Sequence, residues 1–83
     1  MFVTMITPRQ SKAARALLNW KQSDLAEQSG VKLGTVKDFE SERHTLNSKS
    51  LAALARAYQK AGLVLFLDGD GGGAGVRIKE ASD

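Results

Sequence analysis

The sequence contains no cysteine, a single proline and a single histidine among its 83 residues. The lack of cysteine excludes disulfide bridges, zinc sites built on thiolates and thiol nucleophiles. With His44 alone, a His-rich metal site is excluded and a Ser-His-Asp triad has no support. We therefore expect no metal, no cofactor and no enzymatic activity.

Long apolar runs are also missing, since none approaches the roughly 18 residues that a membrane span requires. Residues 1–6 are apolar, but they are few and lack the basic residues that begin a secretory signal. The expectation is a cytoplasmic protein with no membrane partner. A chain of 83 residues has room for one domain, which excludes enzymes that need separate substrate and cofactor domains.

Positive charge is concentrated in the first three quarters of the chain. Residues 1–62 hold ten Lys and Arg against five Asp and Glu, whereas residues 63–83 hold two against four. The net charge of +3 therefore combines a basic body with a mildly acidic tail. A basic excess on one compact part is what a polyanion-binding surface requires.

Capping residues and apolar spacing predict a helical body. Thr7-Pro8-Arg9-Gln10 holds a capping hydroxyl, a proline at the first helical position and a glutamine three residues after the cap, so a helix should run from Pro8 to about Asn19. Further helices are expected over residues 22–29 and 33–41, and from Asn47 or Ser48 to Gly62. On the first helix one broad buried face is expected from Ala13, Ala14, Ala16, Leu17, Leu18 and Trp20.

After Gly62 the pattern changes to that of a β-hairpin, with strands over residues 63–67 and 76–79 around a glycine-rich loop. An isolated hairpin is marginal, so residues 2–6 are a candidate third strand. The apolar hairpin either forms a dimer contact or only covers the core beneath the fourth helix. The loop does not predict calcium, because Lys79 stands where a chelating glutamate belongs. We divide the chain into a domain of residues 1–62, including that candidate strand, and a tail of residues 63–83.

Residues 22–40 are typical of two short helices joined by a tight turn at Gly30. Helices of two turns are not stable alone in water, so they must pack together. The residues expected to make their contacts are Leu25, Ala26, Val31, Val36 and Phe39. Such a unit presents its second helix as a rod that fits the major groove of DNA.

This stretch resembles the phage-repressor-like helix-turn-helix domains of the Cro/cI type, the XRE family. The matching pattern is Gln22-x-x-Leu25-Ala26-x-x-x-Gly30-Val31-x-x-x-Thr35-Val36-x-x-Phe39-Glu40, followed by Leu51-x-x-Leu54-Ala55. The resemblance covers about residues 8–62. It implies a mainly α fold, a repressor-type bundle of four to five helices with a C-terminal β-hairpin, and a sequence-specific DNA-binding transcriptional regulator.

The resemblance also implies roles for individual residues. Gln22 would contact a phosphate, and Arg15 would pair with Glu40 as part of the architecture. Arg43 and His44 either contact phosphates or are solvated. The second helix of the pair would turn six residues towards double-stranded DNA: Lys32, Leu33, Gly34, Thr35, Lys37 and Asp38.

The sequence departs from the family at four positions. Lys21 and Lys32 replace the usual capping Ser or Thr, and a lost cap costs about 0.5–2 kcal/mol. Either both lysines meet phosphates, or they are solvated beside a frayed turn, with Ser23 as a later cap for the first helix of the pair. Gly34 reads no base, so either the backbone approaches DNA closely there or fewer side chains read bases. Glu42 stands where the family usually has glycine.

One such domain buries too little surface for tight operator binding. We therefore expect a homodimer on inverted half-sites about one helical turn apart. The alternative is a protein-interaction module, such as an anti-activator or an antitoxin, that keeps the fold and binds a protein partner through the hairpin.

Overall fold

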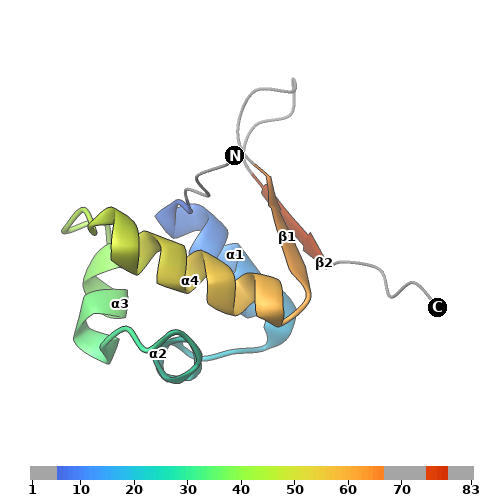
Figure 1. The fold of residues 1–83 in the computed structure, drawn as a ribbon, viewed down its shortest axis with the longest axis horizontal. Helices are drawn as coiled ribbons and strands as arrows, with labels where there is room; N and C mark the ends of the chain where they lie inside the picture. The colour runs from blue at the N-terminus through green and yellow to red at the C-terminus, as the bar shows by residue number, and fades with distance from the viewer. Residues whose placement is uncertain (1–5, 67–74, 79–83) are drawn as a thin grey trace.

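The structure is a computed structural model that describes residues 6–66 and 75–78. Within these ranges four helices precede two strands (Figure 1), and their bounds are α1 (Pro8–Leu18), α2 (Gln22–Ser29), α3 (Leu33–Glu40), α4 (Ser48–Lys60), β1 (Leu63–Phe66) and β2 (Gly75–Ile78). The predicted fold class, a mainly helical bundle with a C-terminal hairpin, is confirmed. Figure 1 shows α2 and α3 at one end of the molecule and the hairpin at the other.

The core lies along α4, which contacts α2 and the hairpin. Leu54 and Tyr58 on α4 are fully buried, together with Leu25 on α2 and Val36 on α3. The half-buried Trp20 stacks on Tyr58 with ring centroids 5.7 Å apart. Each helix therefore contributes to one core, and the short pair α2 and α3 is held by packing rather than by its own propensity.

The helix ends follow from local hydrogen bonds. Thr7 and Gln10 form a capping box, in which each side chain accepts from the backbone N–H of the other. Asn47 caps α4 by accepting from the N–H of Ser50. Gly30 ends α2 with φ of 79°, a left-handed conformation that glycine adopts without steric cost.

The predicted apolar face of α1 is confirmed at Ala14, Leu18 and Trp20, which are buried or packed against the core, and is wrong at the other three positions. The helix buries two polar side chains, Gln10 and Ser11, beside Ala14, whereas Ala13, Ala16 and Leu17 are exposed. Apolar residues occur on several sides of this helix, so hydrophobicity alone does not determine which side is buried. The hydrogen bonds of Gln10 and Ser11 determine the buried side, because burying a polar side chain costs little free energy once its hydrogen bonds are made.

The hairpin lies against α1 and α4. The strands pair antiparallel, with Leu63 opposite Ile78 and Leu65 opposite Val76. Leu63 is buried, and the partly buried Leu65 and Val76 pack against the core. The Gln10 amide donates to the carbonyl oxygen of Gly75 at 2.9 Å, which ties β2 to α1. The hairpin therefore covers the core, as one of the two sequence interpretations expected.

Several sequence expectations fall outside the described residues. These are the candidate strand over residues 2–5, most of the glycine-rich loop, and Lys79. Ile6, the last residue of the candidate strand, is buried but is not in a strand.

The C-terminus of α3 explains why glycine is usual at position 42. The N–H of Arg43 donates to the Asp38 carbonyl, and the N–H of Glu42 donates to the Phe39 carbonyl, both at 3.0 Å. This is the Schellman motif, which requires a left-handed residue after the cap. Glu42 takes that role with φ of 64°. A glutamate in this conformation carries a steric cost that glycine avoids.

We predict that Glu42→Gly raises the free energy of unfolding by about 0.5–1 kcal/mol, since the relief of strain exceeds the added entropy of the unfolded chain. Urea denaturation measures the change. Glu42→Ala is the control, because it removes the charge but keeps the strained conformation. Equal stability of the two variants would contradict the explanation.

Candidate nucleic-acid interface

The position of α3 depends on the buried carboxylate of Glu40 at its C-terminus. This side chain is 2% exposed, and its Oε1 lies 2.7 Å from Nη2 of Arg15. Nε of Arg15 also donates to both carboxylate oxygens, at 3.1 and 2.9 Å. The structure thus brings together the two residues that the family resemblance paired, and the pair links α3 to α1.

Three further side chains complete the network. Ser11 on α1 donates to Oε2 of Glu40, and the Gln22 amide on α2 donates to Oε1 at 3.1 Å. The Tyr58 hydroxyl on α4 donates to the Ser11 carbonyl at 3.0 Å. The network therefore connects all four helices through one charged group. The resemblance identified Arg15 and Glu40, but the sequence analysis missed Ser11. A polar residue inside a helix gives no signal of burial when its partners, Glu40 and Tyr58, are distant in the sequence.

The charge states follow from these contacts. Burial by itself raises the pKa of Glu40, but hydrogen bonds from Arg15, Ser11 and Gln22 outweigh it and hold the pKa below its ordinary 4.5. The hydrogen bond to Glu40 raises the pKa of Arg15. Burial raises the pKa of Tyr58 to about 12. At neutral pH the network therefore contains an ionised carboxylate, a guanidinium and a neutral phenol.

The opposite side of α3 is turned outward. Val36 and Phe39 are buried as predicted. The predicted contact residues on the exposed side are Lys32, Leu33, Gly34 and Lys37, with Thr35 and Asp38 partly buried. Leu33 is 38% exposed on this side of the helix.

The two lysines at the helix starts have different surroundings. Lys32 precedes α3 without any side-chain cap, and the N–H groups of Leu33, Gly34 and Thr35 have no acceptor among the described residues. At α2 the N–H of Lys21 donates to Oδ2 of Asp24 at 2.7 Å. The expectation that Ser23 caps α2 is wrong, because α2 already begins at Gln22 and the carboxylate of Asp24 stabilises its start.

Gln22 makes a contact inside the protein that the resemblance did not imply. Its side chain is directed to Glu40 inside the molecule, so one amide hydrogen is used there. The second amide hydrogen and the backbone N–H of Gln22 have no acceptor among the described residues. Both remain able to donate to a phosphate.

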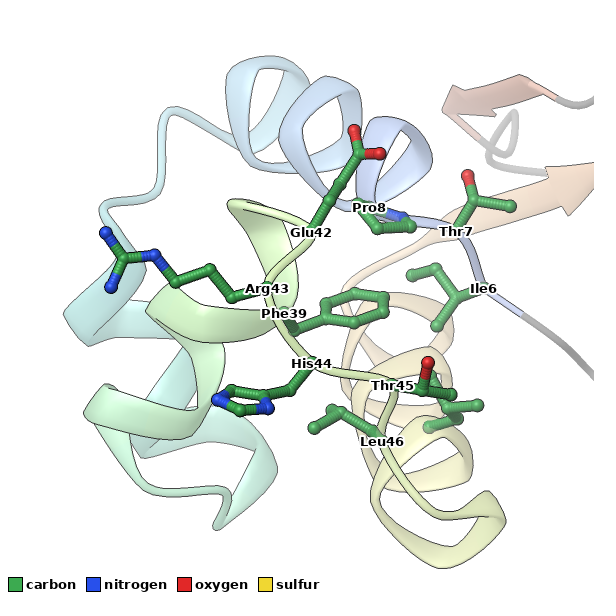
Figure 2. Close-up of a pocket in the computed structure, with 10 residues that line it drawn as sticks. Ile6, Thr7, Pro8, Phe39, Glu42, Arg43, His44, Thr45 and Leu46 are labelled. Atoms are coloured by element: carbon green, nitrogen blue, oxygen red, sulfur yellow. The ribbon is translucent and has the colours of Figure 1, made fainter.

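Arg43 and His44 lie in the loop between α3 and α4. Figure 2 shows both side chains leaving the loop on the side of α3, away from Ile6 and Pro8. Nε2 of His44 lies 4.0 Å from Oδ2 of Asp38, so these two predicted contact residues are neighbours. Arg43 and His44 therefore extend the exposed surface of α3 along the chain.

The same loop borders an open hollow of about 380 Å³. Its lining includes the apolar side chains of Ile6, Pro8, Phe39 and Leu46 (Figure 2). Glu42 and His44 leave the loop in opposite directions, so they form no acid–base pair there. The hollow thus lies between the α3–α4 loop and the residues at the start of α1.

Other kinds of site find no support in the described part of the chain. No cluster of three or more His, Asp or Glu side chains in that part could hold a metal ion. Among the same residues, no helix has both the length and the apolar character of a membrane span.

Two short helices joined by a glycine turn, with the second exposed and the first packed behind it, define a helix-turn-helix protein. The sequence profile of the helix-turn-helix family matches residues 12–63, more than half of the chain. The chain belongs to that family, in its XRE or Cro/cI-like branch, whose members are DNA-binding regulatory domains. A comparison with curated proteins gave no match.

We predict that Glu40→Gln lowers the free energy of unfolding by about 3 kcal/mol at neutral pH, because Arg15 loses its buried partner. Since the folded state lowers the pKa of Glu40, its contribution is fully present above pH 4.5 and is lost as the pH falls further. The difference between wild type and variant should therefore shrink in acid. Urea denaturation from pH 7 to pH 3 measures it, with exposed Glu27→Gln as the control. A constant difference across that range would contradict the assignment.

Proposed function

We propose that the protein is a sequence-specific transcriptional regulator that inserts α3 into the major groove of DNA. The observation that carries this proposal is the outward side of α3, where free N–H groups, two lysines and an exposed leucine lie next to each other. Glu40 holds the opposite side of the same helix inside the protein. A helix so exposed, on a domain of this family, fits the width of the groove.

Phosphate contacts come from the ends of the helices and the loop. The free N–H groups at the start of α3 favour an anion, and Lys32 adds a full positive charge at the same place. Lys21 and Gln22 make the equivalent contact at the start of α2. Arg43 and His44 contact the backbone from the α3–α4 loop. On this proposal the missing caps at Lys21 and Lys32 are compensated when DNA binds.

Base contacts come from the middle of α3. Lys37 donates to guanine O6 or N7, and Asp38 accepts from cytosine N4. The methyl groups of Leu33 and Thr35 contact thymine. Nothing lies within 4 Å of the position that a Cβ on Gly34 would occupy, so the fold itself does not require glycine there. We propose that Gly34 instead allows the duplex to approach α3 closely.

The regulator acts as a homodimer on an inverted repeat, since one α3 reads only a few base pairs. Two-fold symmetric proteins bind two-fold symmetric sites. The basic surface makes affinity depend steeply on salt, because each neutralised phosphate releases a counterion.

The first test is selection of bound fragments from random DNA, followed by the double variant Lys37→Ala with Asp38→Ala. The wild type should enrich an inverted repeat, and the double variant should lose about 1–3 kcal/mol of discrimination for each base contact removed. Its melting temperature should stay close to that of the wild type, because both side chains lie outside the core. Lys60→Ala, an exposed lysine at the far end of α4, is the control.

Two results would overturn the proposal. If no sequence is enriched and a protein partner co-purifies instead, the fold serves as a protein-interaction module. If the double variant is strongly destabilised, the exposed side of α3 has been assigned wrongly.

The second test is Gly34→Ala. Replacing glycine in a helix raises the free energy of unfolding by up to about 1 kcal/mol, and the free space at this position allows the methyl group. If DNA approaches closely there, the same variant should bind the selected repeat more weakly although it is more stable. Fluorescence anisotropy and urea denaturation measure the two effects. Unchanged affinity would show that Gly34 does not mark a close approach.

A further inference from the structure

One side of α1 presents apolar side chains to the outside. Ala13, Ala16 and Leu17 are exposed on this helix, Leu17 by 44%, and Ile78 on β2 is 56% exposed. Leu33, the third exposed large hydrophobic among the described residues, lies on the surface proposed to contact DNA. We call the surface formed by Ala13, Ala16, Leu17 and Ile78 the α1–β2 face. DNA binding does not explain why it is apolar.

The two elements that form this face are in direct contact. The Gln10 amide donates to the carbonyl oxygen of Gly75 at 2.9 Å, which joins the first half of α1 to the start of β2. Beside this bond, Arg9, Ala13 and Val76 line an open hollow of about 510 Å³ between the helix and the strand. The α1–β2 face is therefore bordered by a depression rather than by a flat surface.

The apolar side chains continue from this hollow along both elements. Leu17 lies one helical turn after Ala13, so the two side chains are neighbours on the same side of α1. Ile78 lies two residues after Val76 and therefore on the same side of the strand. Alanine side chains leave room for another helix to approach α1 closely. The shape thus suits a helix laid against α1.

The charges at the border of the α1–β2 face are positive. Arg9 lines the hollow, and Lys12 is exposed one turn before Ala16. Neither cation makes an ion pair with another described residue. The acidic residues of the described ranges all belong to α2, α3 and the loop after α3, so none lies on α1 or β2. An apolar surface bordered by unpaired cations is complementary to a segment in which carboxylates flank apolar side chains.

We propose that the α1–β2 face binds an acidic amphipathic helix of a protein partner. Apolar side chains of the partner helix, spaced three and four residues apart, pack on Ala13, Leu17 and Ile78. Asp or Glu side chains beside them pair with Arg9 and Lys12. The face contains few side chains, so the complex is of the transient kind that buries less than about 1,200 Å². Salt weakens it, because the charge pairs lie at the surface.

Binding at this face leaves α3 accessible. Figure 1 shows α3 and the hairpin at opposite ends of the molecule, whose longest dimension is 36 Å. The protein can therefore hold DNA and the acidic helix at the same time. Peptide binding is measured without DNA, so its outcome and that of the operator selection are independent of each other.

The test selects peptides that bind the full-length protein from a display library of random sequences. Enriched peptides should combine Asp and Glu with apolar residues spaced three and four apart. Fluorescence anisotropy with labelled peptides measures their affinity. Leu17→Asp should weaken binding by about tenfold or more, because the complex would bury a carboxylate among apolar groups. Gln28→Asp, which adds the same charge to an exposed position on α2, is the control and should bind as the wild type does.

A charge exchange tests the cations. Arg9→Glu with Lys12→Glu should weaken binding of the acidic peptides by about tenfold and should allow binding of peptides in which Lys replaces each Asp and Glu. Recovery by the basic peptides shows that the variant folds. Lys32→Glu with Lys49→Glu is the matched control, since both lysines are exposed and line a different hollow beside the α2–α3 turn. It should leave binding of the acidic peptides unchanged.

Four outcomes would overturn the inference. Selection that enriches no acidic peptides would do so directly. Loss of peptide binding in the Lys32 and Lys49 variant, or displacement of the peptides by DNA, would show that they bind the DNA surface instead. Dissociation of a wild-type dimer by Leu17→Asp in sedimentation velocity would assign the face to a second copy. Binding that appears only in Glu80→Gln with Asp83→Asn would assign it to the acidic end of this chain.

Discussion

The fold depends on keeping one carboxylate charged inside the protein. An isolated buried carboxylate is very costly, and Glu40 is tolerated because donors from α1 and α2 surround it. Tyr58 on α4 holds Ser11, which is one of those donors. A buried carboxylate is stable only while its hydrogen-bond donors stay in place. The network therefore fixes the orientation of α3 relative to α1 and α2. The exposed side of α3 is therefore set by the same interaction that stabilises the bundle.

The buried network around Glu40 explains why α3 is stable although both of its ends are unfavourable. The helix begins without a cap at Lys32 and ends at a left-handed Glu42, two features that each cost free energy. At its inner side, Val36, Phe39 and Glu40 supply the compensating packing and hydrogen bonds. The uncapped start at Lys32 lies on the surface proposed to contact DNA, where a protein gains by leaving polar groups unsatisfied until a ligand binds.

The sequence predicted those parts of the molecule that rest on local rules. Thr7 and Asn47 begin their helices with side-chain hydrogen bonds, and Gly30 ends α2 in a left-handed conformation. These residue types at these positions are recognisable in the sequence. The burial of Ser11 was not predictable, because it depends on Glu40 and Tyr58, which are distant in the sequence. The Arg15–Glu40 contact was expected only through the resemblance, since periodicity carries no information about which charges meet.

The hairpin covers the core with only part of its surface. A two-stranded sheet has two faces and two edges, and packing on α1 and α4 uses only part of them. Leu63 is buried in this packing, while Ile78, its partner across the strands, remains 56% exposed. On α1, the network around Glu40 buries Ser11 on one side of the helix and, by fixing the rotation of that helix, leaves Ala13, Ala16 and Leu17 exposed.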